Sequence, residues 1–221
     1  MDRQFWLERW QRREIGFHQA TVNAALQRHW PALALPAGAS VLVPLAGKSL
    51  DMTWLAAQGF SVIGVELSDD ACAEYFAEHG LDPQVDIVGP FTRRRAGNVT
   101  LLGGDIFALP DGFHRDIMAV YDRGALVALP PAMRQRYVEA VYTPLAPAAQ
   151  ALLVALDYPQ EHMQGPPFAI GEAEMRALFG SGWQCTVLEQ RDILAEEPRF
   201  QQAGLPRLHS TAWHLRRHRL G

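Results

Sequence analysis

Short apolar runs alternate with amphipathic stretches along most of this chain. The runs at residues 40–44, 61–66, 99–102, 115–120 and 151–156 each have the length of one buried strand. The stretches after the first two runs repeat their apolar residues at helical spacing. This order of strand, helix and strand predicts a doubly wound α/β sheet whose strands are mostly parallel.

The last part of the chain has a different pattern. Residues 183–189 and 209–216 alternate apolar and polar positions, which is typical of antiparallel strands, and the long loop 190–208 lies between them. Residues 91–102 are predicted to form a hairpin that turns at Ala96-Gly97-Asn98. No segment has the composition of a linker, so we expect a single α/β domain.

A loop and an acid follow the first two predicted strands. The loop Leu45-Ala46-Gly47-Lys48-Ser49 leads into a helix that Ser49 can cap. The second strand ends on Glu66, at about the 20-residue spacing from which an acid can bind a ribose. The loop matches neither GxGxxG nor a phosphate-binding loop. A nucleoside site and an ordinary βαβ unit with a solvated Glu66 therefore both remain open.

The N-terminal residues 1–36 carry aromatic side chains at helical spacing. Trp6 and Trp10 share one face of the first predicted helix, and Gly16 interrupts the pattern before a second helical stretch. One interpretation is a pair of amphipathic helices packed on the domain. The other is a helical lid that closes a flat ligand against the catalytic core, residues 37–221.

Three further segments place polar groups at the ends of predicted strands. In Gly103-Gly104-Asp105, the glycines let a backbone approach a ligand, and Asp105 is a possible acceptor for an exocyclic amine. The pair Asp122-Arg123 is either part of a site or a structural ion pair. The proline-rich loop 158–168 is placed as a substrate loop would be.

Composition limits the classes of partner. The chain has 221 residues, a net charge of −4 and a pI near 6.0, so no global field attracts nucleic acid. The two cysteines lie far apart, and the histidines show no metal-ligand spacing. The N-terminus is unlike a signal peptide, and no apolar run reaches membrane-spanning length. We therefore expect a cytoplasmic protein without a metal, a membrane or a nucleic-acid partner.

Several strings together resemble the thiopurine S-methyltransferase family in its bacterial form, over nearly the whole chain. They are Trp10 with Gly16-Phe17-His18, Val43-Pro44-Leu45-Ala46-Gly47-Lys48-Ser49, Gly64-Val65-Glu66-Leu67-Ser68, Tyr121-Asp122-Arg123-Gly124-Ala125-Leu126-Val127-Ala128, Gly165-Pro166-Pro167-Phe168 and Leu178-Phe179-Gly180. The resemblance implies a class I, Rossmann-like, seven-stranded methyltransferase fold. It also implies S-adenosylmethionine as cofactor, which has no pyrophosphate for a glycine-rich loop to hold.

The resemblance also implies roles for single residues. Those expected to contact the cofactor are Trp10, Leu45, Gly47, Glu66, Leu67, Asp105, Ile106 and Arg123. Phe17, Arg123 and Arg199 would face the acceptor. Arg123 would stabilise an anionic acceptor, and Asp122 would orient Arg123. The implied reaction is direct displacement, in which the sulfur of a thiopurine or another aromatic or heterocyclic thiol takes the methyl group.

Other functions stay open from the sequence. The resemblance also fits an enzyme whose physiological acceptors are selenium or tellurium compounds, with a role in detoxification and tellurite resistance. A non-catalytic nucleoside-binding module is a further possibility. A nicotinamide dehydrogenase fits the spacing alone, but the absence of GxGxxG argues against it. In each case we expect a monomer with a small-molecule ligand.

Overall fold

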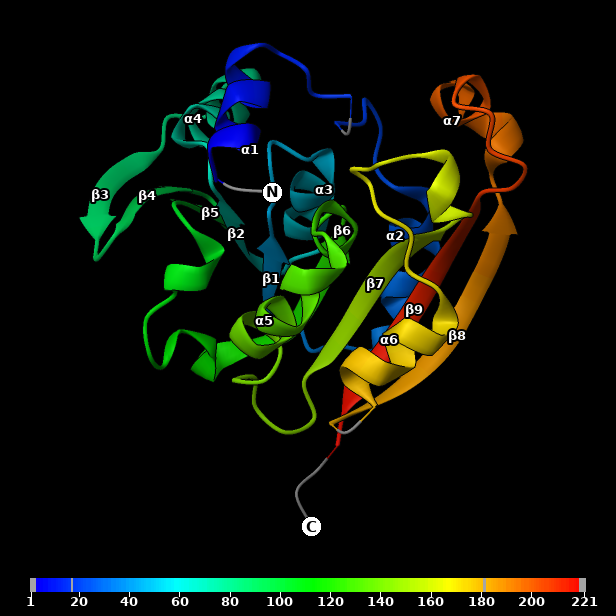
Figure 1. Cartoon of the computed structure of the whole chain (residues 1–221). Helices are drawn as coiled ribbons and strands as arrows, with labels where there is room; N and C mark the ends of the chain where they lie inside the picture. The colour runs from blue at the N-terminus through cyan, green and yellow to red at the C-terminus, as the bar shows by residue number, and fades with distance from the viewer. Residues whose placement is uncertain (1–2, 17, 181, 219–221) are drawn as a thin grey trace.

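One sheet lies at the centre of the molecule, with helices on both of its faces (Figure 1). The computed structural model describes residues 3–16, 18–180 and 182–218. In these ranges the sheet has nine strands in the order β3-β4-β5-β2-β1-β6-β7-β9-β8. The strands are β1 (Ser40–Pro44), β2 (Ser61–Glu66), β3 (Gln84–Val88), β4 (Phe91–Ala96), β5 (Val99–Gly103), β6 (Ile117–Arg123), β7 (Gln150–Asp157), β8 (Trp183–Asp192) and β9 (His209–Arg217).

Seven of these strands form the sheet that the sequence predicts. From β5 to β7 every neighbouring pair is parallel, and β9 and β8 follow as an antiparallel pair. The expected hairpin is present as β4 and β5. In the described residues the sheet has two more strands than the seven expected. The additional strands are β3 and β4, which pair with each other and extend the sheet beyond β5. All five residues of β3 are exposed, so its sequence has no inward face to reveal it.

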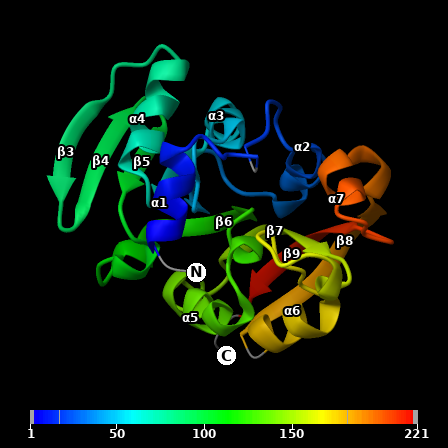
Figure 2. The same ribbon diagram turned by 45° about the horizontal axis from the view of Figure 1, so that its top comes forward.

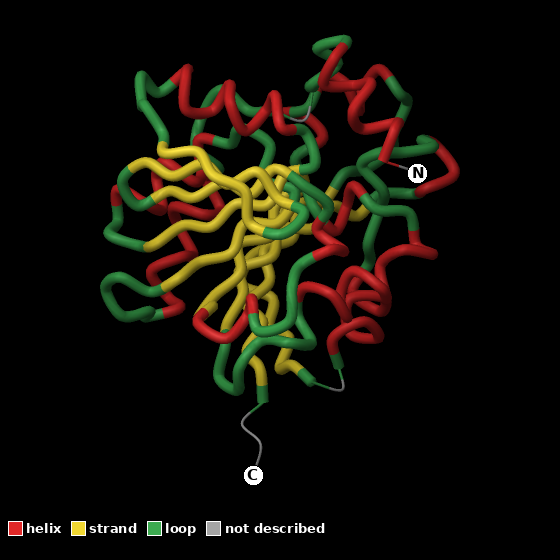
Figure 3. The backbone as a smooth tube through the Cα atoms, turned by 90° about the vertical axis from the view of Figure 1, so that its left-hand side faces the viewer, coloured by secondary structure: helices red, strands yellow, loops and turns green. Residues whose placement is uncertain are grey.

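Alternation along the central strands separates two cores. In β1, Val41 and Val43 pack into one cluster with Met52 and Tyr75, whereas Leu42 belongs to the other cluster with Tyr137. Helices α2, α3 and α4 cover the first face, and α5 and α6 cover the second (Figure 2). Viewed from the side, the twisted strands lie between these two layers of helix (Figure 3).

Three of the described helices, α2, α3 and α4, begin after a residue whose side chain caps them. The helices are α1 (Arg3–Gln11), α2 (Ala24–His29), α3 (Leu50–Ala57), α4 (Asp69–Glu78), α5 (Pro131–Val141), α6 (Glu172–Phe179) and α7 (Pro198–Gln202). The Ser49 side chain accepts a hydrogen bond from the N–H of Asp51, and the Ser68 side chain accepts one from Ala71. Among the described residues, no helix is long and apolar enough to cross a membrane.

The N-terminal segment is held unevenly. Helix α1 has no buried residue, although Phe5, Trp6 and Trp10 all make contacts. The second predicted helix is short, because α2 begins only at Ala24 and continues as the 3₁₀ turn Trp30–Leu33. Just before α2, the N–H of Asn23 donates to the Asp51 carboxylate, at an N···O distance of 2.8 Å. The segment is therefore anchored by a hydrogen bond at α2, whereas α1 makes its contacts through side chains that are not fully buried.

A buried arginine joins α5 to the loop before α6. Arg134 is fully buried, and its guanidinium donates to the carbonyl oxygens of Leu129 and Ala169, at N···O distances of 3.1 Å each. It also forms an ion pair with Glu174, at 2.6 Å. These contacts hold the segment that follows the loop of Pro166 and Pro167.

We expect Arg134→Met to lower the free energy of unfolding by about 2–3 kcal/mol, because it leaves two carbonyl groups without a donor. The measurement is urea denaturation of both proteins. Arg191→Met is the matched control, since Arg191 pairs with Glu196 at the surface and its loss should cost less than about 1 kcal/mol. Equal losses for the two variants would contradict the structural role of Arg134.

Candidate functional site

A cavity of about 700 Å³ lies at the carboxyl ends of the parallel strands. This is the edge of the sheet where ligands bind in doubly wound folds. The loop after β1, the end of β2, the turn after β5 and the end of β6 each contribute to its lining. In Figure 1 this edge is at the top, beneath α1 and beside α7.

Glu66 is the acid at the end of β2, and its carboxylate joins two loops. One oxygen accepts a hydrogen bond from the N–H of Gly47, and the other accepts one from Ser68, at N···O distances of 2.9 Å each. Burial raises the pKa of Glu66, while these donors and the Trp10 indole act in the opposite direction. Glu66 is thus a buried acceptor fixed at the wall of the cavity, and the interpretation as a solvated strand end is wrong.

The loop after β1 has an unusual backbone. Gly47 has a φ of 53°, and a Cβ at this position would lie 3.3 Å from Cζ2 of Trp10. Glycine therefore allows both the turn and the close approach of the indole. Leu45 also lies in the left-handed region, with a φ of 46°, and it lines the cavity. A non-glycine residue in this region is uncommon and often marks a functional site.

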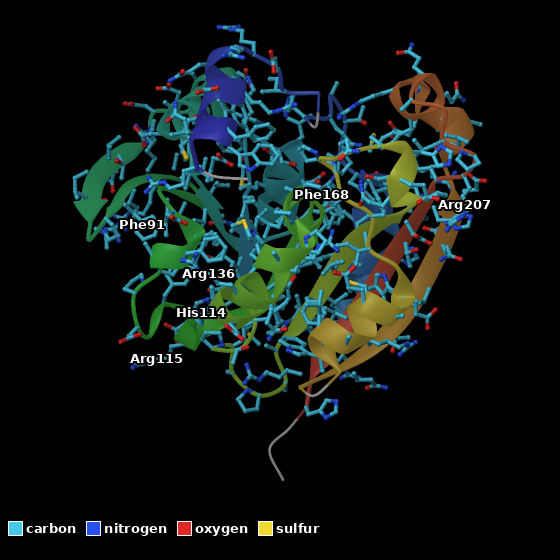
Figure 4. All side chains as sticks on the ribbon, viewed as in Figure 1. Phe91, His114, Arg115, Arg136, Phe168 and Arg207 are labelled. Atoms are coloured by element: carbon cyan, nitrogen blue, oxygen red, sulfur yellow. The ribbon has the colours of Figure 1, made fainter. Side chains whose placement is uncertain are left out.

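The turn after β5 places Asp105 and Ile106 in the cavity lining, as the sequence predicts for them. The Asp105 carboxylate accepts a hydrogen bond from the N–H of Phe107, at 3.0 Å, and so begins a short 3₁₀ turn. The two preceding glycines have a different role from the one expected. A Cβ on Gly103 would collide with Asp69, and one on Gly104 with Phe91, which Figure 4 labels. Their space is taken by the protein's own side chains.

Two cations in the lining differ in their pairing. Lys48 donates to Glu74 at 2.8 Å and to Glu78 at 2.5 Å, both on α4. Burial alone would lower the pKa of Lys48, but the two carboxylates raise it above its usual value. Arg123 has no ion-pair or hydrogen-bond partner among residues 3–16, 18–180 and 182–218. Its guanidinium is therefore available to an anionic ligand.

Asp122, the neighbour of Arg123, lies outside the cavity lining. Its side chain is almost fully buried and accepts hydrogen bonds from the hydroxyls of Tyr137 and Tyr142, at 2.7 and 2.8 Å. It also accepts one from the N–H of Leu126, at 3.1 Å. Asp122 and Arg123 form no ion pair in the described residues, because strand alternation points the two side chains in opposite directions, so the interpretation as a structural ion pair is wrong.

Three segments cover the cavity, and we call them the roof: α1, the loop of Pro166 and Pro167, and α7. Arg199 on α7 donates to the carbonyl oxygen of Pro166, at 3.0 Å. One of its guanidinium nitrogens would lie 3.8 Å from a Cβ at Gly16. Phe168 follows the loop, and its N–H donates to the carbonyl of Val127 (Figure 4). Arg199 therefore connects residues that are distant in the sequence.

Most of the residues predicted for the site lie together. Those in the cavity lining are Trp10, Leu45, Gly47, Glu66, Leu67, Asp105, Ile106, Arg123 and Arg199. Phe17 lies outside the described residues. The sequence analysis missed His18, Lys48 and Arg136, which also line the cavity. His18 was part of a matching string, and Lys48 was considered only as a phosphate ligand. No sequence motif pointed to Arg136, because it lies within α5 and not in a loop that follows a predicted strand.

Comparison with known families decides the identity of this site. A sequence model described as Thiopurine S-methyltransferase matches residues 1–218. The chain belongs to the thiopurine S-methyltransferase family.

Relatives with this name support the assignment. The thiopurine S-methyltransferase of Xanthomonas campestris pv. campestris is 50% identical over 98% of this chain and 100% of its own length. That of Bordetella parapertussis is 48% identical over 98% of this chain and 99% of its own. The family prediction is confirmed. The chain is a methyltransferase enzyme that depends on S-adenosylmethionine, so a binding module and a nicotinamide dehydrogenase are not favoured.

Solved structures agree at the level of the fold. A Burkholderia thailandensis 1,6-didemethyltoxoflavin-N1-methyltransferase with bound S-adenosylhomocysteine matches with a TM-score of 0.64. It is 18% identical and covers 98% of this chain and 87% of its own. A SAM-dependent methyltransferase from Methanosarcina mazei matches with a TM-score of 0.61 at 15% identity, over 89% of this chain and 98% of its own. The predicted Rossmann-like methyltransferase fold is confirmed.

We expect Asp122→Ala to lower the free energy of unfolding by about 3–5 kcal/mol, because it leaves two buried hydroxyls and one buried N–H without an acceptor. Tyr142→Phe removes only one of these bonds and should cost about 1 kcal/mol. Thermal and urea denaturation provide both values. A loss for Asp122→Ala no larger than that for Tyr142→Phe would show that this carboxylate does not support the end of β6.

Proposed function

We propose that this chain transfers a methyl group from S-adenosylmethionine to the sulfur of thiopurines and of other aromatic or heterocyclic thiols. The observation that carries the proposal is a cavity lined by a fixed carboxylate, Glu66, at the end of β2 and by a cation, Arg123, at the end of β6, with β1 between these two strands. Within the described part of the chain, Arg123 has no ion-pair partner. The cavity volume of about 700 Å³ lies within the usual range for small-molecule sites.

The donors and acceptors at the β1–β2 end fit the cofactor. Glu66 is placed to accept hydrogen bonds from ribose hydroxyls, and Asp105 and Ile106 border the neighbouring space for an adenine. Trp10, Leu45, Gly47 and Leu67 complete this wall. The loop with one glycine suits a ligand without a pyrophosphate. When bound, the cofactor supplies an activated methyl group on a sulfonium sulfur.

The chain's own residues would mainly position the acceptor. Arg123 and Arg199 provide positive charge in the lining, and Leu129 with Pro166 provides apolar surface for a flat ring. We assign Phe17 to the same region from the family resemblance. Arg123 would stabilise the developing or existing negative charge on the acceptor sulfur, in a cavity where such interactions are strengthened by the exclusion of water. Alignment then supplies much of the rate enhancement.

Asp122 would stabilise the position of Arg123 from outside the cavity lining. Its bonds to Leu126 and to two tyrosines fix the turn that follows Arg123. We therefore propose a positioning role for Asp122, which acts through the backbone and not through contact with the guanidinium.

Residues 1–36 are proposed as a lid over the core of residues 37–221, and α1 is the part of this lid that belongs to the roof. Support comes from α1, which places Arg3, Trp6 and Trp10 in the lining but has no buried residue. A helix held in this way can leave and return at a low free-energy cost. The monomeric state and the cytoplasmic location remain predictions from the sequence. No observation favours selenium or tellurium compounds over thiols.

The first test is calorimetric titration with S-adenosylmethionine, followed by a methyl-transfer assay with 6-mercaptopurine in the same sample. We expect binding and turnover in the wild type. In Arg123→Met, kcat/KM for 6-mercaptopurine should fall about 100-fold, because a positive charge in the cavity lining is lost. Arg115→Met is the control, since Arg115 is exposed, lies outside the lining and should leave turnover unchanged. Binding without methylation of any thiol would refute the proposed activity.

The role of Glu66 has its own test. We expect Glu66→Gln to weaken the binding of S-adenosylmethionine about 10- to 100-fold, since hydrogen bonds to a charged acceptor are lost. The same calorimetry with a 2′-deoxyribose analogue separates a ribose contact from a general loop defect. The wild type should discriminate against the analogue, and Glu66→Gln should do so much less. Equal discrimination by both proteins would remove Glu66 from the ribose site.

A further inference from the structure

One titratable side chain in the cavity has no place in the mechanism described so far. His18 lines the cavity together with Gly16, Lys48 and Arg123. It lies just after the segment that Arg199 approaches at Gly16. The backbone of this segment is held by a hydrogen bond from the N–H of His18 to the carbonyl of Ile15, at 2.8 Å. His18 thus belongs to the lining that also holds Arg123, close in sequence to the segment that Arg199 approaches.

The imidazole of His18 is available for proton transfer. Among residues 3–16, 18–180 and 182–218, its ring makes no hydrogen bond or ion pair, unlike the rings of His29, His79 and His214. The charged groups that face it are Lys48, Glu78 and Arg123. Partial burial and the two cations lower the pKa of His18, and Glu78 opposes them. A lowered pKa favours the neutral imidazole, which is the form that can accept a proton.

We propose that His18 accepts the proton of acceptor thiols that are not ionised at neutral pH. The step rests on the proposed S-methyl transfer. The S–H bond breaks and its proton moves to an imidazole nitrogen. The sulfur electron pair forms the new C–S bond, and the electron pair of the broken C–S bond stays on the cofactor's sulfur. The imidazolium then releases the proton to solvent through its exposed side.

This role follows from what Arg123 alone cannot supply. A guanidinium stabilises a thiolate but cannot take up a proton. An unperturbed thiol such as that of cysteine has a pKa of about 8.5, so only a small fraction is ionised at neutral pH. Burial first, and then the positive charge of Lys48 and Arg123, favour neutral His18, and the same positive charge also favours the thiolate product of proton transfer. His18 would thus extend the range of acceptors from acidic aromatic thiols to more basic ones.

The test compares two aromatic thiols of similar size. 4-Nitrothiophenol is acidic because of its nitro group, and 4-methoxythiophenol is more basic. At about pH 6, near the usual histidine pKa of about 6.5, we expect His18→Gln to reduce kcat/KM for 4-methoxythiophenol at least about tenfold more than for 4-nitrothiophenol. The exposed His162, which lies outside the lining, provides the control variant His162→Gln, with no difference between the thiols.

The pH profile gives a second, more specific readout. In the wild type, kcat/KM for 4-methoxythiophenol should be level between the pKa of His18 and that of the thiol. In His18→Gln it should rise about tenfold per pH unit toward the pKa of the thiol, because only the ionised acceptor reacts. Two-dimensional NMR should also show one imidazole, absent in His18→Gln, that titrates below the ordinary histidine range.

Two other outcomes would overturn the inference. An equal loss of activity with both thiols would show that His18 only binds or supports the acceptor. No loss with either thiol would show that it has no role. These results differ from failure of the proposed function, in which the wild type would bind S-adenosylmethionine but methylate neither thiol, and the assignment of His18 would fall with it.

Discussion

The arrangement of the site depends on one buried carboxylate. Glu66 accepts hydrogen bonds from Gly47 in the loop after β1 and from Ser68 at the start of α4. Its carboxylate therefore joins the loop after β1 to the turn after β2. Because it is buried, an unpaired charge there would be costly. The backbone donors satisfy it and at the same time fix the loop that carries Leu45. The shape of one wall of the cavity therefore depends on the backbone hydrogen bonds that a single buried acid requires.

A second buried carboxylate lies behind another part of the lining, next to Arg123. Asp122 ends a central strand and is held by two tyrosine hydroxyls from the α5 layer. Glu66 faces the ligand space and Asp122 faces the core, although both are acids at the ends of parallel strands. Strand alternation decides which of the two acids can meet a ligand, and the residue next to Asp122, Arg123, takes the position in the cavity.

The sequence predicted the central strands, two helix caps and the acid of the cofactor end, because these depend on local periodicity and on spacing within one βαβ unit. Most of the other lining residues were predicted only through the family resemblance. It could not place β3, whose residues are exposed on both faces. It also assigned Asp122 to Arg123, because adjacency in the chain does not show which side of a strand a residue faces. Contacts across the roof, such as that of Arg199 with Pro166, join segments with no sequence relation.

The construction of the roof has a consequence for the timing of catalysis. Its N-terminal part, α1, has no buried residue, while the sheet beneath it is closely packed on both faces. A movement of α1 away from the cavity would break the contact of the Trp10 indole with Glu66 and would leave both hydrophobic cores intact. The helix that lines the ligand space is thus separate from the residues that stabilise the fold, so a substitution in α1 can alter ligand exchange without a matching loss of stability.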